Sequence, residues 1–287
     1  MAGGSRFEIR QAGEGDVPAI RAILAAHGND GEVVVADVVG PYLRHLIARG
    51  GARVAVEGDE VVGFGAAIDT GRCVHLADLF IRPDRIGGGI GKPLLAAAFG
   101  EAPRRTTFAS DDPRALPIYV RAGMLPLWAS LYLEGPADRL PAAPPSLRTE
   151  SATPDVLAAT ERAWTGADRL DDHRFWSSQP DADTFTVIDG DDVVAIGSGR
   201  ARQASPVRVL DRLVVHPDTA VDPVPATFAA LASAARGGVI LACIQGPSPV
   251  LRPLLDLGFR IADRDQFMSS EPDLVDPARL IPNPGML

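Results

Sequence analysis

The sequence is poor in cysteine, in long apolar runs and in clustered positive charge, and each absence removes a class of protein. Cys73 and Cys243 are the two cysteines among 287 residues, and neither belongs to a CxxC pair, so neither a disulfide framework nor a zinc site is indicated. No apolar run approaches the roughly 20 residues of a membrane helix. The first residues also lack the apolar segment of a secretory signal. We therefore expect a cytoplasmic protein with no metal cofactor and no membrane partner.

Positive charge is in the minority. The chain has 28 Lys and Arg against 37 Asp and Glu, which gives a formal net charge of -9. Proteins that follow a phosphate backbone present a basic stripe, and none is visible here, so no nucleic-acid partner is expected. What the chain does have is apolar content, since 46% of its 287 residues are hydrophobic. That is enough for two domains with cores of their own.

The two halves of the chain resemble each other at three places, in the same order and at nearly constant spacing. The matched segments are residues 9–24 with 147–164, residues 76–84 with 210–218, and residues 116–124 with 251–259. One pair of repeats predicts a duplicated domain and not a solenoid. Residues 138–147 are rich in proline, which indicates an extended connector. We therefore predict one domain over residues 1–137, a linker over 138–147, and a second domain over 148–287.

Strand and helix patterns alternate in both halves. Residues 52–56 and 61–68 read as a hairpin, and residues 184–188 and 193–197 are its counterpart. Paired strands that alternate with helices predict an α/β (α+β) protein in which each half is a mixed, mostly antiparallel sheet flanked by helices.

A glycine-rich turn follows an apolar strand in the first half. The strand ends at Pro83, and a helix is expected to begin between Gly91 and Pro93. Glycines let a ligand approach the backbone closely. The first amides of a helix have no internal partner and lie at its positive end, which suits a pyrophosphate.

Two other phosphate-binding motifs do not fit this turn. A nucleotide P-loop fails because Ile86 and Pro93 occupy the positions of its first glycine and its hydroxyl residue. A dinucleotide fingerprint fails because Lys92 stands at its third glycine. A flexible strand-to-helix turn without a ligand remains the alternative.

The turn and a second motif downstream resemble the core motifs of the GNAT superfamily of N-acyltransferases. The family's Q/R-x-x-G-x-G/A falls on residues 86–91, and both required glycines are present. Its N-x-x-A-x-x-L-Y-x-x-x-G-F falls on residues 112–124, with the alanine, the tyrosine and the glycine matched. The resemblance covers nearly all of the first half. The chain departs from the family at four positions: Ile86, Asp112, Ile118 and Met124.

The resemblance implies that acetyl-CoA, or another acyl-CoA, is the co-substrate and lies between two splayed parallel strands. Backbone groups of Leu79, Phe80 and Ile81 would bind the pantetheine and thioester. The pyrophosphate would be held by the amides of the turn. The residues that the resemblance assigns to cofactor binding after the strand are Gly87, Gly88, Gly89, Ile90, Gly91, Lys92 and Asp112.

The resemblance also implies direct attack of an amine on the thioester. Tyr119 occupies the position of the acid that protonates the leaving thiolate, and its alternative role is ring packing in the core. Asp78 is the candidate base, with an ordinary surface or hydrogen-bonding role as its alternative. Thr107 stands where some members place a glutamate. Asp111 and Asp112 read as a turn or a helix cap, and His75 as a structural histidine.

The second half has lost the glycine turn. Residues 219–225 read Thr-Ala-Val-Asp-Pro-Val-Pro, so two prolines remove amide donors and Asp222 repels a phosphate. This indicates a degenerate copy that packs as a scaffold, walls the acceptor pocket, or mediates assembly such as a homodimer. Six residues of its first helical region form a cluster that either lines a pocket or packs: Trp164, Asp171, Asp172, His173, Phe175 and Trp176. The proline-rich tail, residues 276–287, is expected to lie extended over a surface.

The favoured function is therefore an N-acyltransferase whose acceptor is an amine of a small molecule or a peptide. The acceptor would enter along residues 24–49, where specificity would depend on His27, Asn29, Asp30, Glu32, Tyr42 and His45. A non-catalytic acyl-CoA-binding or scaffold protein is the alternative. A nucleotide-phosphate binder is a third and weaker one.

Overall fold

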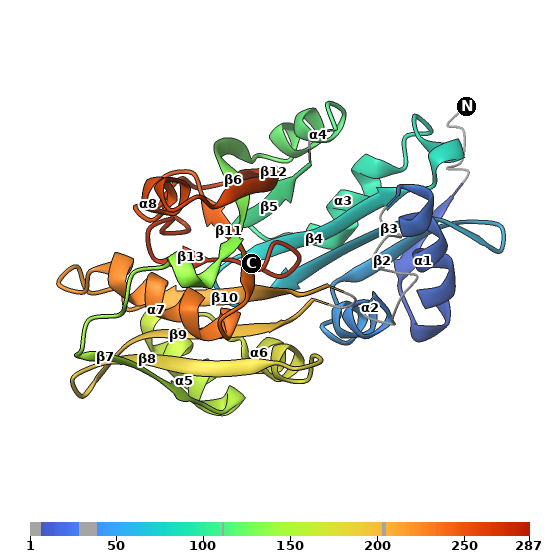
Figure 1. Cartoon of the computed structure of the whole chain (residues 1–287). Coiled ribbons are helices and arrows are strands. Elements are labelled where there is room, and N and C mark those ends of the chain that lie inside the picture. The colour runs from blue at the N-terminus through green and yellow to red at the C-terminus, as the bar shows by residue number, and fades with distance from the viewer. Residues whose placement is uncertain (1–6, 29–38, 111, 203–204) are drawn as a thin grey trace.

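The computed structural model describes residues 7–28, 39–110, 112–202 and 205–287 (Figure 1). The first half contains four helices, short 3-10 turns and six strands among these residues. Its elements are β1 Glu8–Gln11, η1 Glu14–Asp16, α1 Val17–Ala26, α2 Val39–Ala48, β2 Ala52–Glu57, β3 Glu60–Asp69, β4 Val74–Ile81, η2 Pro83–Arg85, α3 Gly91–Phe99, β5 Arg105–Ala109, α4 Ala115–Arg121, β6 Leu125–Pro136 and η3 Ala137–Arg139.

The second half repeats this order after residues 140–146. Its elements are β7 Leu147–Ser151, α5 Pro154–Thr165, α6 Leu170–Ser177, β8 Asp183–Asp189, β9 Asp192–Ala201, β10 Val207–Val215, α7 Pro223–Ala235, β11 Val239–Gln245, α8 Leu251–Asp256, β12 Arg260–Ser269 and β13 Leu280–Ile281. Local signals in the sequence set several ends. Helix α5, for example, begins after Thr153, whose side chain accepts from the Val156 amide, and ends at Gly166 in the left-handed conformation. The described helices include none long and apolar enough to cross a bilayer.

All the described strands belong to one sheet, and the halves exchange their last strands. The order is β1-β2-β3-β4-β5-β12-β6-β11-β10-β9-β8-β7, with β13 attached to β10. Strand β12 of the second half pairs with β5 of the first, and β6 of the first half pairs with β11 of the second. The residue patterns predict the strands of each half but do not show this exchange. Figure 1 shows the two halves meeting along β6, β12 and β11.

The internal repeat extends to an irregularity in the sheet. The β3–β4 pairing skips Ala77, and the β9–β10 pairing skips Asp211. These residues occupy equivalent positions in the two matched segments. A bulge places one extra residue in a strand and bends it. Both copies therefore bend the central strand at the same point.

The hydrophobic cores cross the boundary between the halves. Trp176 of α6 is buried against first-half residues such as Ile20 and Leu43, in a cluster that also contains Met286 from the end of the chain. The larger core of the second half lies between α7 and the strands β8–β11. The halves are thus joined by shared apolar packing as well as by the sheet.

The tail is not laid over an outer surface, and the prediction on this point is wrong. Ile281, Met286 and Leu287 are buried, and the tail runs between the two halves to the centre of the molecule (Figure 1). Its apolar side chains and its strand β13 find partners in both halves. These contacts explain why a proline-rich segment here is part of the core.

Candidate active site

A cavity opens where two parallel strands of the first half separate. Strands β4 and β5 pair from Val74 and Arg105 only as far as Leu76 and Thr107. Beyond this point β4 continues to Ile81 without β5, because the bulge at Ala77 turns it away. The cavity between the strands has a volume of about 460 Å³ and is lined by residues of β4, β5, α3, α4 and β12.

The open side of β4 presents the backbone of alternate residues. Phe80 lies opposite Phe64 of β3, and two residues further on the amide of Arg82 donates to the Val62 carbonyl at 2.9 Å. Backbone groups of an antiparallel strand alternate in direction, so those of Phe80 face β3, while those of Leu79 and Ile81 face the cavity. This corrects the predicted set, because Phe80 can contribute its side chain to the cavity but not its backbone.

The glycine-rich turn leads from η2 into α3 beside this cavity. Gly87 and Gly89 have φ values of +87° and +81°, which glycine adopts without strain. Five backbone amides of the turn donate no hydrogen bond, in a stretch (residues 82–94) that the structure describes throughout. These belong to Gly87, Gly89, Ile90, Gly91 and Lys92. The Gly88 amide donates to the Arg85 carbonyl at 3.1 Å, so Gly88 is a correction to the predicted donors.

The side chains around the turn include Ile86, one of the four departures from the family motif. Ile86 stands at the position of the usual glutamine or arginine, is 38% exposed and lines the cavity. Arg85 does not replace the missing side chain, because it binds Glu57 at 2.8 Å and Asp84 at 2.7 Å. Ile90 is buried beneath the turn, packed with Val62 and Leu94, and only its backbone faces outward.

Asp78 lies on the wall of the cavity directly after the bulge. Its Oδ2 accepts a hydrogen bond of 3.0 Å from the hydroxyl of Tyr42 on α2. Burial raises the pKa of the Asp78 carboxyl to about 6, and the hydrogen bond from Tyr42 limits the rise. A carboxyl that titrates near neutrality can take up a proton during a reaction.

Tyr119 reaches the same cavity from α4. It is 7% exposed and packs against β4 and α3 residues, such as Leu76 and Leu95. Burial raises the pKa of its phenol well above the usual value, and the charges of Asp78, Asp112 and Asp265 add to the rise. The phenol therefore stays protonated at neutral pH and can donate a hydrogen bond.

The other polar candidates divide into those inside and those outside the cavity. Asp112 lines the cavity, but it also pairs with Arg114 at 2.7 Å and accepts from the Arg114 amide at the start of α4. Thr107 lines it too and donates to the Leu76 carbonyl. His75 is fully buried and bonded through both ring nitrogens, to Thr106 and Pro284, and burial lowers its pKa to about 3. Asp111 lies outside the described residues.

One cavity residue had no signal in the sequence. Asp265 belongs to β12 of the second half, and the strand exchange brings it to the cavity of the first half. Tyr132 of β6 donates to its Oδ2 at 2.6 Å. A strand position in the second repeat carries no indication that it serves the first repeat, so only the sheet order could reveal Asp265.

Of the residues expected to meet the acceptor, His27 lines the cavity and its Nε2 lies 2.7 Å from the Ile81 carbonyl oxygen. His45 instead binds Asp172 of the second half at 2.7 Å, which corrects its predicted role. Asn29, Asp30 and Glu32 lie outside the described residues.

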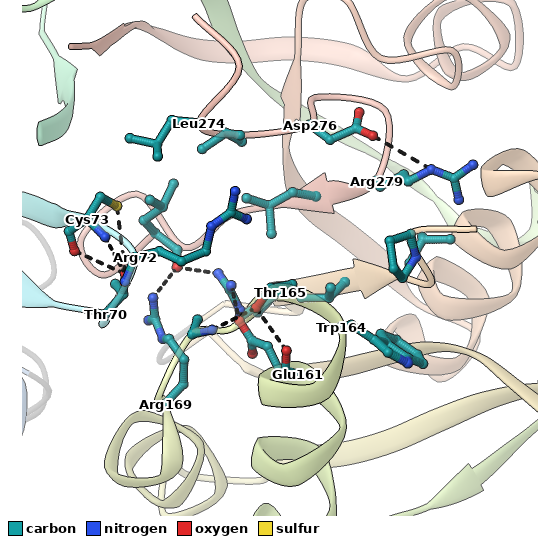
Figure 2. A pocket seen from close by; sticks show the side chains of 18 residues that line it. Thr70, Arg72, Cys73, Glu161, Trp164, Thr165, Arg169, Leu274, Asp276 and Arg279 are labelled. Carbon is teal, nitrogen blue, oxygen red and sulfur yellow. Dashed lines mark hydrogen bonds and ion pairs between the residues drawn. The ribbon is translucent and has the colours of Figure 1, made fainter. Parts of the chain in front are cut away.

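The cluster of the second half packs between the halves. Asp172 is buried and binds Arg169 at 2.9 Å as well as His45, while Glu161 binds His173 at 2.8 Å and is paired with Arg212. Figure 2 shows Glu161 and Arg169 of the second half and Thr70 and Cys73 of the first around a small cavity of about 140 Å³. These charges are matched to one another, so the cluster joins the halves and does not extend the cavity at β4.

The equivalent opening in the second half is partly filled by the chain itself, since residues 282–284 line it. Strands β10 and β11 pair over Val207–Leu210 and Val239–Ala242, and β13 then pairs with Leu213 and Val214. These two residues correspond to Leu79 and Phe80. At the start of α7, the Asp222 side chain takes the Val224 amide, and Pro223 and Pro225 have none. The second half thus keeps a cavity of about 480 Å³ beside Leu210, Asp211 and Ala242. Its strand edge at Leu213 and Val214 is taken by β13, and the start of α7 lacks a cradle of free amides.

Comparison with known proteins agrees with this geometry. Residues 36–126 match the family model of the acetyltransferase (GNAT) domain. The first half contains a GNAT domain. No curated protein matched the sequence.

Solved structures extend the likeness to both halves. A putative acetyltransferase from Pyrococcus horikoshii has a TM-score of 0.68 at 13% identity and covers 100% of this chain and 96% of its own. A tandem GNAT protein from the clavulanic acid biosynthesis pathway has a TM-score of 0.62 at 16% identity, over 93% of this chain and 99% of its own. A GCN5-related N-acetyltransferase from Sphaerobacter thermophilus has a TM-score of 0.57 at 13% identity, over 98% and 99%. At these identities the likeness shows the fold, which is that of a tandem GNAT protein.

Proposed function

We propose that this protein is an N-acyltransferase that moves an acetyl or other acyl group from CoA to an amine at the cavity of the first half. The single observation that carries the proposal is the opening between β4 and β5, which ends at the free amides of the glycine turn. Five unpartnered donors at the N-terminus of α3 form a ready anion site. The open backbone of Leu79 and the amide of Ile81, whose carbonyl is taken by His27, suit an extended amide-bearing chain such as pantetheine.

The residues of the cavity fit direct acyl transfer. Asp78, with a pKa of about 6, accepts the proton that the attacking amine releases as its nitrogen bonds to the acyl carbon. Tyr119 remains protonated and donates to the sulfur as the carbon–sulfur bond breaks. The leaving group departs as free CoA thiol, and the amine becomes an amide. The proton on Asp78 then returns through solvent to the Tyr119 phenolate, so protons and electrons balance.

A non-catalytic acyl-CoA-binding protein is the second candidate, and Ile86 favours it. Members of the family usually place a glutamine or an arginine there, whereas Ile86 offers no hydrogen bond, and Arg85 is held by Glu57 and Asp84. A binding protein would keep the amides of the turn and show no turnover.

Two measurements test the proposal. Acetyl-CoA and not ATP should raise the melting temperature, because a ligand that binds only the folded state stabilises it. Release of CoA thiol across a panel of amines then separates enzyme from binding protein. Both cysteines are buried, so a thiol reagent reports CoA with little background. Stabilisation without thiol release for any amine would favour the binding protein, and no stabilisation would reject both.

A further inference from the structure

The hydroxyl of Tyr42 lies between the candidate base and the tail of the chain. It is 3.0 Å from Oδ2 of Asp78 and 3.2 Å from the carbonyl oxygen of Gly285. Tyr42 is on α2 of the first half, and Gly285 is 243 residues further along the chain. We propose that Tyr42 positions the Asp78 carboxylate for proton transfer, and that the C-terminal segment, residues 282–287, holds Tyr42 in place. This inference rests on the proposed function, because Tyr42 and the C-terminal segment would act on the Asp78 carboxylate of that same site.

The hydrogen bond has a defined direction. Burial and the charge of Asp78 raise the pKa of Tyr42 well above its usual value, so its phenol is protonated at neutral pH. The hydroxyl has one hydrogen, which it donates to the carboxylate when Asp78 is ionised. When Asp78 is protonated, the Gly285 carbonyl offers that hydrogen a second acceptor. Tyr42 can therefore serve both protonation states without moving its ring.

Gly285 is the position at which the segment meets Tyr42. A Cβ on Gly285 would lie 2.7 Å from the Tyr42 hydroxyl oxygen and 3.2 Å from its Cζ. A contact under 3 Å forces one of the two groups to shift, so a side chain here displaces the hydroxyl. Glycine allows the close approach because it has no Cβ.

The segment is anchored on both sides of Gly285. The side chain of Asn283 donates to Asp211 at 3.1 Å and accepts from the Gly285 amide at 3.1 Å. The Pro284 carbonyl accepts from Nε2 of His75 at 2.9 Å, and the Leu287 carbonyl accepts from Arg169 at 2.7 Å. The segment cannot shift away from Tyr42 without breaking its hydrogen bonds to Asp211, His75 and Arg169, of which the one to Arg169 is buried and costly to leave unmade.

Other ionisable groups share the cavity with Asp78, so a control has to separate their effect on its pKa from the effect of Tyr42. The titratable and charged groups that share its cavity, from α1, α4, β12 and the loop before α4, are His27, Tyr119, Asp112, Arg114 and Asp265. Replacement of the Tyr42 hydroxyl alone leaves all of these unchanged, and Tyr42→Phe keeps the ring that packs against the core.

The test is a double-variant cycle read by carbon NMR titration of the Asp78 carboxyl, whose signal is assigned by its loss in Asp78→Asn. Tyr42→Phe should move the midpoint upward by about 1 pH unit, because the carboxylate loses its donor. Gly285→Ala should move it in the same direction by displacing the hydroxyl. The acid limb of kcat/KM should follow, with the KM for acetyl-CoA unchanged. Gly15→Ala is the matched control, since nothing lies within 4 Å of its Cβ.

The cycle distinguishes positioning from general destabilisation. Gly285→Ala should add nothing in the Tyr42→Phe background, because the hydroxyl it displaces is absent. An unchanged midpoint in Tyr42→Phe overturns the role of Tyr42, and it decides the matter even if Gly285→Ala fails to fold. The role of the segment is overturned if Gly285→Ala leaves the midpoint of the parent protein unchanged. It is also overturned if Gly285→Ala shifts the midpoint as much in the Tyr42→Phe background as in the parent. If the midpoints shift as expected but no amine releases thiol, the positioning stands and the proposed function falls.

Discussion

The hydroxyl of Tyr132 donates a hydrogen bond of 2.6 Å to Asp265, although the two residues belong to different halves of the chain. Tyr132 lies on β6 and Asp265 on β12, the two strands that the halves exchange. Asp265 lines the cavity that also contains Asp78 and Tyr119. The candidate site of the first half is therefore completed by a strand from the second, and this gives the degenerate copy a physical role.

The first prediction concerns the separated halves. Residues 1–147 alone should not fold to a stable monomer, because β5 would lose β12 and β6 would lose both of its neighbours. Unpaired strand edges favour aggregation. Circular dichroism melting and size-exclusion chromatography check this. Co-expression with residues 148–287 should restore a soluble complex that acetyl-CoA stabilises. A monomeric, cooperatively melting fragment would contradict the dependence.

The second prediction concerns the proton donor. Tyr119→Phe should leave acetyl-CoA binding within a factor of two or so, while the rate of thiol release falls by roughly 10–1000-fold if the phenol protonates sulfur. Calorimetry gives the affinity and a thiol assay gives the rate. Tyr132→Phe is a useful comparison, since it also removes a phenol hydroxyl. That hydroxyl binds Asp265, and Tyr132 lies on β6 and not on α4. Unchanged turnover would remove Tyr119 from the mechanism.

The third prediction is a pH dependence. Asp78 must be ionised to accept a proton, and its pKa is raised to about 6, so kcat/KM should rise with pH through about 6. Because the folded pKa is above the unfolded value, burial of Asp78 also costs stability as the pH rises from the unfolded pKa towards about 6, and the full cost is present above that. In Asp78→Asn the acid limb should disappear and the rate should fall by about 100–10,000-fold. A persistent limb near 6 would point to another group.

The fourth prediction is the number of bound cofactors. Calorimetry should give one acetyl-CoA per chain, because β13 occupies the strand edge in the second half and its turn lacks free amides. Gly91→Val should weaken this binding by about tenfold or more, equivalent to at least about 1.4 kcal/mol, by covering the amides of the turn. Its Cβ would meet only Ile118 at 3.8 Å, so folding should be preserved. Two equivalents per chain would refute the loss of the second site.

The fifth prediction concerns the ion cluster between the halves. Glu161 is buried and paired with Arg212 and His173, and the charge of Arg212 and these hydrogen bonds hold its pKa below the usual range despite burial. Glu161→Gln should lower the free energy of unfolding by about 3–5 kcal/mol at neutral pH, because it leaves buried charge unpaired. A lowered folded pKa gives stability that is present above the unfolded pKa and is lost as the pH falls. The exposed pair Arg148–Glu150 supplies the control, since Glu150→Gln should change stability by less than about 1 kcal/mol.

The sequence by itself determined the helices and strands and the glycine-rich turn with its free amides. Alternating apolar residues set the hairpin β2–β3, the position of Gly91 and Pro93 set the start of α3, and the matched segments revealed the duplication. These are local properties, because hydrophobic period, turn residues and missing amide donors act within a few residues of the chain. Asp78 and Tyr119 were candidates because of the family resemblance, whose motifs lie at a fixed distance from the turn along the sequence.

Only the tertiary structure decided which strands meet and what lines each opening. The exchange of β6 and β12, the approach of Asp265 to the first half, the pairing of β13 with β10 and the contact of Gly285 with Tyr42 join residues far apart in the chain. Such contacts depend on which buried edges and apolar faces find a partner once the whole molecule has collapsed, and not on the pattern within any one segment. The same strand edge therefore stays free in one half and is paired with the tail in the other.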